Sequence, residues 1–291
     1  MQQIIQQLLN GLALGGLYVT FAVGMTLIYS VLRIIHLAHG TMILIGAYSS
    51  LLLLPYFWNN LAITVTIGAL LAGLIGMLIG MGAYVPLLKR RAYDATLLIS
   101  VAILIASEEA FMIIFGARHK QYPQAINAIA LDILGVKVFI IQLVCAVVSI
   151  ISMAMLWFFL VKTDEGRALR ALDQNPVLAS LHGVNPLKTY AIALLVGSIL
   201  GGLSGALLGL YYNDVHPEMV FMPVTVALCI IIVGGLGSVF GTVIAGLMIG
   251  VLETFALAYI PFEFPRTMVS FICLIVTLLL RPQGILGRGK K

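Results

Sequence analysis

Three glutamates interrupt long apolar segments, and their carboxylates are the first candidates for chemistry. Glu108, Glu109 and Glu253 each lie within a long, mainly apolar run. An ionisable group inside a membrane span is costly and usually serves a function. We expect each glutamate to pair with a basic group, to line a water-filled path or to contact a substrate amine. Hydrogen bonding between helices is the alternative, and Glu109 is also expected near a membrane interface.

Two histidines form the second candidate pair. His36 and His39 stand three residues apart in the stretch Ile35–Gly40 (IHLAHG). This spacing could hold a metal ion on one helix face, but no third ligand stands nearby in the sequence. A structural or interfacial role is therefore favoured, and no metal site is predicted.

Motifs of enzymes are absent from the sequence. It has no GxxxxGK[ST], HExxH or GxSxG pattern, and His182 and His216 have no nucleophile at a useful spacing. We therefore expect a protein that is not an enzyme and binds no cofactor itself. Any ATP would have to be hydrolysed by another polypeptide. The net charge of +5 comes from basic residues at the ends of apolar runs, which does not indicate nucleic-acid binding.

The composition predicts an all-α, polytopic membrane protein with about eight transmembrane helices in one domain, residues 1–291. Of its residues 62% are hydrophobic and 9% are charged, and the mean hydropathy is +1.12. Soluble domains usually carry about 25% charged residues, and about 20 apolar residues cross a bilayer as a helix. The apolar runs lie near 8–32, 37–54, 61–88, 95–115, 138–161, 189–212, 220–258 and 266–280.

Basic residues predict the orientation of these runs. Twelve would fall on one side of the membrane and four on the other, and the positive side is normally cytoplasmic. The C-terminus and the loops 89–94 and 162–188 are then cytoplasmic, and the N-terminus is outside. The twelve are Arg33, Lys89, Arg90, Arg91, Lys162, Arg167, Arg170, Lys188, Arg281, Arg288, Lys290 and Lys291; the four are Arg118, Lys120, Lys137 and Arg266.

Two glycine-containing breaks interrupt the apolar pattern. Residues 35–40 join the first two runs, and residues 233–238 divide the run 220–258, which is too long for one span. Whether this run crosses twice or re-enters is left open by the sequence. Unwound backbone at membrane depth persists only where protein or water satisfies it, and such breaks often face a translocation path. The expected path residues are His36, His39, Gly40, Glu108, Gly234, Gly235, Gly237, Ser238 and Glu253.

Residues 162–188 are a polar island between two apolar runs. Thr163 or Asp164 can cap a helix that begins near Glu165. Asn175-Pro176 interrupts this helix, and Gly183 ends the second piece. Two short surface helices would form a knob for a soluble partner, and an interfacial loop without a partner is the alternative. The expected coupling residues are Glu165, Gly166, Arg167, Arg170, Ala171, Asn175 and Gly183.

These motifs resemble those of the LivH-type permeases of branched-chain amino-acid ABC transporters. Residues 35–40 resemble the family's I-N-F-A-H-G stretch, and residues 166–171 with 181–185 resemble its cytoplasmic coupling loop. The segment 234–241 is similar to G-G-x-G-S-x-x-G, and the segment 281–287 to R-P-x-G-[IL]-[LFM]-G. The resemblance implies a permease in the bacterial inner membrane that imports branched-chain or other hydrophobic amino acids. Its implied partners are a second permease (an identical or a different chain), two ABC ATPases that bind ATP, an extracytoplasmic solute-binding protein and the lipid bilayer.

The chain departs from this pattern at two places. His36 stands where the family commonly has asparagine, and Glu108-Glu109 stands where relatives carry polar amides. Permeases for urea and short amides share all four motifs, so they remain an alternative. An ion-coupled secondary transporter that uses Glu108, Glu109 or Glu253 as a relay is the second class of function. The long loop 162–188 argues against it.

Overall fold

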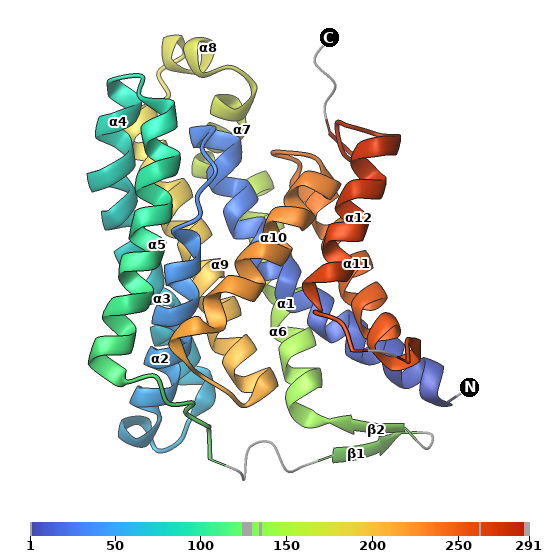
Figure 1. Ribbon diagram of the computed structural model, residues 1–291. Helices are drawn as coiled ribbons and strands as arrows, with labels where there is room; N and C mark the ends of the chain where they lie inside the picture. Colours follow the sequence, from blue (N-terminus) through green and yellow to red (C-terminus); the bar gives the residue numbers. More distant parts are fainter. Residues whose placement is uncertain (1, 124–129, 134–135, 262, 288–291) are drawn as a thin grey trace.

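The computed structural model describes residues 2–123, 130–133, 136–261 and 263–287 (Figure 1). The described chain is helical apart from its connections and one β-hairpin. The elements in chain order are α1 (Gln2–Leu32), α2 (His39–Leu53), η1 (Leu54–Phe57), α3 (Leu61–Ile79), the π-helical turn η2 (Gly80–Tyr84), α4 (Val85–Lys89), α5 (Tyr93–Phe115), β1 (Ala130–Ile133), β2 (Val136–Phe139), α6 (Ile140–Lys162), α7 (Asp164–Gln174), α8 (Pro176–Leu181), α9 (Pro186–Tyr212), η4 (Pro217–Val220), α10 (Phe221–Gly234), α11 (Val239–Tyr259) and α12 (Thr267–Leu280).

Eight helical segments in the described chain are long and apolar enough to cross a membrane. This confirms the expected all-α polytopic class. The assignment of the runs differs at the end of the chain, because α12 has only 14 residues and is shorter than these eight. The eighth segment comes instead from the run 220–258, which forms two helices.

The long helices alternate between the two ends of the molecule. In Figure 1 the α7–α8 pair, the α4–α5 connection and the end of α12 lie at the top, and the start of α1 and the β-hairpin lie at the bottom. We call these the knob end and the N-terminal end. The helix ends that carry the large basic group meet at the knob end, as predicted; Arg288, Lys290 and Lys291 lie outside the described residues.

The run 220–258 passes through the molecule twice. Helix α10 rises to the knob end, residues 235–238 turn the chain, and α11 returns toward the N-terminal end (Figure 1). The segments Pro217–Gly234 and Val239–Tyr259 are each long and apolar enough to span. The structure thus favours two crossings over a re-entrant segment.

The connection between the apolar runs 95–115 and 138–161 contains a small element that hydropathy did not indicate. Strands β1 and β2 pair antiparallel, with Ala130 opposite Phe139 and Ile133 opposite Val136. The hairpin lies at the N-terminal end, beyond the start of α6 (Figure 1). It adds no crossing and leaves the course of the helices as expected.

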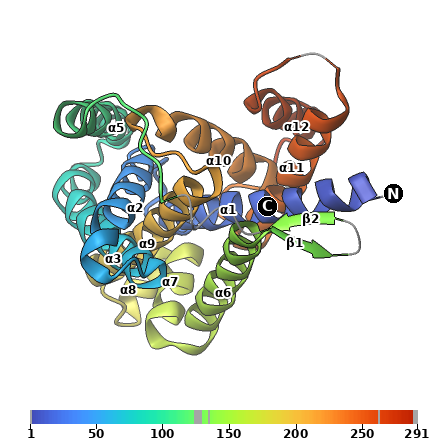
Figure 2. The same cartoon turned by 90° about the horizontal axis from the view of Figure 1, so that it is seen from below.

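Helix α1 is the central element of the bundle. In its most apolar stretch 94% of the residues are buried, compared with 17% in α5. Figure 2 shows α1 running through the middle, with α9, α10, α11 and α6 around it and α5 at the periphery. The outer faces of α3, α5 and α6 therefore carry the exposed apolar surface that a bilayer would cover.

Glycines allow very close contacts between helices in this bundle. A methyl group on Gly24 of α1 would lie 2.6 Å from the carbonyl oxygen of Gly197 in α9. One on Gly46 of α2 would overlap the carbonyl of Gly202 in α9. Since lipid removes the hydrophobic drive between helices, such close approach supplies the packing energy.

Replacing Gly46 by alanine should separate α2 from α9. Overpacking typically costs about 1–3 kcal/mol, and here the obstacle is backbone that cannot rotate away. We expect a lower unfolding temperature of the purified protein for Gly46→Ala. Gly82→Ala is the control, because nothing lies within 4 Å of a methyl group at Gly82. Equal unfolding temperatures for the two variants would contradict this account.

Candidate functional site

The first break is an extended segment that leaves α1 and enters α2 through buried surroundings. Arg33 has a φ of 57° and ends α1. His36 and His39 that follow are both fully buried. The Nδ1 atom of His36 lies 3.0 Å from the hydroxyl of Tyr84, and the His39 ring centroid lies 4.8 Å from that of Phe21. His36 thus contacts η2 and His39 contacts α1, and neither ring is exposed at an interface.

Neighbouring helices satisfy the backbone of this break. The hydroxyl oxygen of Ser100 in α5 accepts a hydrogen bond from the Ala38 N–H at 2.9 Å. The hydroxyls of Thr41 and Ser107 lie 2.7 Å apart. Unwound backbone among apolar helices needs such partners, so α5 has a structural part in holding the break.

Gly40 and Glu108 lie on the same side of this break. A methyl group on Gly40 would lie 2.5 Å from Val220 and 2.7 Å from Leu104. Glu108 is buried and follows Leu104 by one helical turn on the same face of α5, whereas Glu109 is exposed. The first break, Gly40 and Glu108 thus belong to one region between α2, α5 and η4.

The second break, residues 233–238, is a turn that is hydrogen-bonded to the C-terminal segment 281–287. The N–H groups of Ile285 and Leu286 donate to the carbonyls of Val233 and Gly234, at 2.8 and 3.2 Å. Gly235 has a φ of 101°, and a methyl group there would lie 2.4 Å from the backbone nitrogen of Gly287, so a side chain does not fit. The two motifs at 234–238 and 281–287 are therefore halves of one structural unit at the knob end.

The rest of this turn packs on neighbouring helices. Ser238 caps α11, since its side chain accepts from the Gly241 N–H at 3.1 Å. Gly237 lies beside Tyr29 and Arg33 at the end of α1. Both breaks thus adjoin the C-terminal end of α1. Residues 35–40 follow this end in the chain, and Gly237 packs against it.

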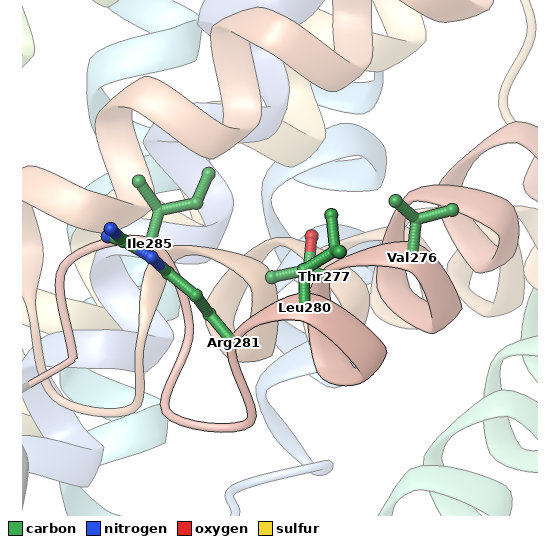
Figure 3. A pocket seen from close by; sticks show the side chains of 5 residues that line it. All are labelled: Val276, Thr277, Leu280, Arg281 and Ile285. Carbon is green, nitrogen blue, oxygen red and sulfur yellow. The ribbon is translucent and has the colours of Figure 1, made fainter.

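A small pocket opens where the C-terminal segment leaves α12. Its volume is about 240 Å³, and Arg281 and Ile285 border it together with three residues of α12 (Figure 3). The α12 residues are Val276, Thr277 and Leu280. All of its lining residues come from α12 and from the segment that follows α12. None of the predicted path residues lines it, so the pocket is separate from the predicted path.

Glu253 occupies a separate place between α1 and the α11–α12 connection. Its carboxylate accepts hydrogen bonds from the Tyr18 hydroxyl at 3.1 and 3.2 Å, and the Arg266 guanidinium lies 3.9 Å away. Burial alone lowers the pKa of Arg266, but Tyr212 and Glu253 raise it above its usual value, so Arg266 stays charged. This is the pairing with a basic group that the sequence left open.

The predicted path residues therefore do not form one cluster. His36, His39, Gly40 and Glu108 gather around the start of α2, the glycine turn lies at the knob end, and Glu253 is paired at α1 and α11. Sequence reasoning missed Tyr84, Ser100 and Tyr18, which satisfy these groups. Only contacts between distant helices identify them.

The coupling segment forms the knob with a buried underside. Leu169 and Leu172 of α7 are 1% exposed and pack with the ends of α1, α6 and α9. Gly166 lets α7 fold back on α6, because a methyl group there would lie 2.6 Å from the Leu160 carbonyl oxygen. Arg33 of α1 binds Asp173 at 3.0 Å, and Lys188 of α9 lies 3.6 Å from Glu165.

Helix caps fix the shape of the knob. Thr163 caps α7 through the Gly166 N–H at 3.0 Å, and Asn175 caps α8 through Val177 and Leu178 at 3.0 Å each. Gly183 has a φ of 84° and reverses the chain after α8. The predicted cap, interruption and stop are thus confirmed.

The outer face of the knob combines charge and apolar surface. Arg170 is exposed, and Arg167 is 61% exposed while it pairs with Asp164 of its own helix. Three apolar side chains of α8 point outward, which sequence reasoning did not select: Val177, Leu178 and Leu181 are 69%, 53% and 76% exposed. The signal available in the sequence was their helical spacing, which places all three on the side of α8 away from Ala179. The structure shows that Ala179 is buried.

The bundle of crossing helices with a protruding helical knob defines a class: a polytopic, all-α membrane protein. A solved structure, PsaBC from Streptococcus pneumoniae in complex with Fab, shares this fold with a TM-score of 0.51 and 14% identity, over 94% of this chain and 91% of that chain. At this identity the likeness concerns the fold alone.

Sequence comparisons specify the family. Residues 7–280 match the family described as branched-chain amino acid transport system / permease component, and the chain belongs to this family. It is 30% identical to the permease LivH of Salmonella typhimurium over 98% of this chain and 96% of that protein. A probable LivH of Methanocaldococcus jannaschii is also 30% identical, over 93% of this chain and 89% of that protein. The family consists of transport permease components, in agreement with the expectation that the chain is not an enzyme.

Replacing Arg266 by methionine should leave the buried carboxylate of Glu253 with Tyr18 as its remaining partner. Breaking a buried pair can cost about 3–5 kcal/mol, but Arg266 is 44% exposed, so we expect about 1–2 kcal/mol after solvent screening. The measurement is the unfolding temperature of the purified chain. Arg118→Met is the matched control, an exposed arginine at the same end. A loss no larger than in that control would show that the pair is not stabilising.

Proposed function

We propose that this chain is the permease subunit of an ABC importer for branched-chain or other hydrophobic amino acids in a bacterial inner membrane. It works with a second permease subunit, two ATPase subunits that bind ATP, and an extracytoplasmic solute-binding protein. The knob end and the C-terminus face the cytoplasm. Family membership over nearly the whole chain supports the proposal, and so does the basic charge at the helix ends of the knob end.

The single observation that carries the mechanism is the construction of the knob. Its underside is bound to α1, α6 and α9 by buried leucines and by the pairs Arg33–Asp173 and Lys188–Glu165. Its outer face leaves Arg170 and the apolar residues of α8 free for contact. A protein that moves α7 and α8 would therefore move the ends of three long helices. This is the mechanical property that an ATPase needs in order to drive alternating access.

The relatives support the choice of solute and of partner. The LivH proteins are named for branched-chain amino acid transport. The chain is also 23% identical to LivM of Escherichia coli, over 93% of this chain and 68% of that protein, which supports a pair of related permease subunits. Urea or a short amide in the same fold is the alternative solute.

The region around the start of α2 is the proposed solute path. Here His36, His39 and Glu108 place polar atoms inside an apolar bundle, where uncompensated polar groups are expensive. In the conformation described, the two histidines are fully buried. Opening of the path therefore requires α1, α2 and α5 to separate, and movement of the knob is the proposed cause.

Introducing a charge into the apolar face of α8 should detach the ATPase. Leu181→Asp is expected to weaken binding by about tenfold or more, the effect of losing a central apolar anchor. Arg170→Ala should reduce coupled uptake through the same surface. The measurement is the amount of P-loop ATPase that co-purifies with the chain, together with amino-acid uptake.

The matched control for this test is Tyr56→Asp, because Tyr56 is 80% exposed at the N-terminal end. It adds the same charge far from the knob and should leave the ATPase bound. Unchanged co-purification and unchanged uptake in Leu181→Asp would refute docking on α8.

A cysteine at the first break should become reactive in step with the transport cycle. We expect His36→Cys, in a chain with Cys145, Cys229 and Cys273 replaced, to react slowly with a water-soluble thiol reagent at rest. The rate should rise when ATP and solute are supplied, because the path then opens to water. Inertness under all conditions would argue against a path at this break.

An ion-coupled secondary transporter is the second candidate. The position of Glu253 argues against it. Its carboxylate is held by Tyr18 and Arg266, so it is occupied in a structural pair. The dependence of uptake on ATP rather than on an ion gradient separates the two functions.

A further inference from the structure

Three potential metal ligands lie together at the N-terminal end, and none of them is among the predicted path or coupling residues. They are His119, Asp214 and His216, and one ligand atom from each lies within 4.8 Å of the others. The sequence showed no such group, because His119 precedes α6 and the other two follow α9. The side chains are 63%, 32% and 23% exposed, so the cluster is open to solvent on one side.

Backbone pairing between the two connections brings these residues together. Lys120 and Val215 exchange both of their backbone hydrogen bonds, at 2.9 and 2.8 Å, in an antiparallel bridge. In this register His119 stands opposite His216 in the adjacent pair without hydrogen bonds, where Cα atoms are only about 4.5 Å apart. The two imidazole centroids are 4.3 Å apart. The facing histidines are thus fixed by the backbone and are not a chance meeting of mobile side chains.

Further contacts anchor this bridge to the bundle. The Tyr122 N–H donates to the side chain of Asn213 at 3.0 Å, and Asn213 ends α9 with a φ of 51°. The Tyr122 hydroxyl is buried 2.6 Å from the Ser50 hydroxyl, and burial raises its pKa to about 12. Tyr122 therefore stays neutral and ties the connection to α2.

The geometry of the donor atoms suits a metal ion. The Nδ1 atom of His119 lies 2.9 Å from both carboxylate oxygens of Asp214, and the Nδ1 atom of His216 lies 3.3 Å from one of them. Zinc bonds of about 2.0–2.2 Å in a tetrahedron separate neighbouring ligands by about 3.3 Å. The His216 nitrogen makes no hydrogen bond within the described residues despite this distance. When the proton of the neutral ring is on Nε2, this nitrogen presents a lone pair for coordination.

The charge around the cluster also favours a cation. Consecutive residues of an extended segment point to opposite faces, and Lys120 lies over the rings of Phe115 and Tyr48, at 5.2 and 5.8 Å. The lysine that adjoins His119 in sequence is therefore turned away from Asp214. Two imidazoles and one carboxylate select zinc or a similar transition-metal ion over calcium or magnesium, which prefer oxygen ligands.

We propose that His119, Asp214 and His216 form a binding site for a divalent transition-metal ion of the zinc class. Three protein ligands leave one tetrahedral position for water or another donor. The ion would join the connection after α5 to the connection between α9 and α10. It would stiffen the N-terminal end of the bundle. This proposal does not depend on the solute that the permease carries.

The test is metal binding by the full chain, purified in detergent with an affinity tag that contains no histidine and stripped by a chelator. The probes are Zn²⁺ for stoichiometry and Co²⁺ for its visible absorption. We expect one ion per chain, nitrogen and oxygen coordination in the Co²⁺ spectrum, and a higher unfolding temperature when Zn²⁺ is added.

His119→Gln and His216→Gln should each weaken binding by at least about tenfold, the lower limit for losing even a partner that only orients a ligand. His182→Gln is the control, since it also removes one histidine but lies beside α8 at the knob end. Without metal, all variants should unfold at the same temperature as the original chain, which separates loss of a ligand from loss of the fold. The proposal is overturned if the original chain binds no Zn²⁺ or if the His182 variant loses as much binding as the other two.

Discussion

Direct contact between helix backbones is the constraint on which this molecule depends. Helix α9 approaches α1 at Gly197 and α2 at Gly202, so that side chains on the facing helices have no room to intervene. In a lipid environment this contact replaces the hydrophobic effect as the reason for assembly. The same closeness encloses the extended segment after α1. Its polar groups can then find partners on α5 and η2 instead of water.

The knob extends this constraint from the bundle to its surface. A surface loop normally moves independently of the helices it joins. Here the leucines of α7 are part of the core at the ends of α1, α6 and α9, and Gly166 allows the first turn of α7 to lie on α6. Rigid attachment below and free apolar side chains above are the two properties that a mechanical linkage requires. They come from the two faces of the same short helices.

Local chemistry made much of this arrangement predictable. Hydropathy identified the long helices, and the capping preferences of Thr163 and Asn175 located the ends of α7 and α8. These features depend on residues close in sequence.

Pairings between distant segments could not be predicted from the sequence in the same way. The partners of Glu253 are Tyr18 in the first helix and Arg266 beyond its own, and the bridge of Lys120 with Val215 brings two unrelated loops together. A single sequence carries no signal for such meetings. The structure therefore shows Glu253 in a paired position, one of the alternatives that the sequence left open, and brings His119, Asp214 and His216 together.

The link between the 235–238 turn and the C-terminal segment has a consequence for how the protein is made. Val233 and Gly234 leave the ribosome well before Ile285 and Leu286, whose amide groups bond to their carbonyls. Until α12 and the segment after it have been made, these carbonyls lack the partners that they have in the finished protein. Residues 285 and 286 then complete the hydrogen bonding of the turn. A chain that stops after α12 would keep every long helix and still lack a completed turn.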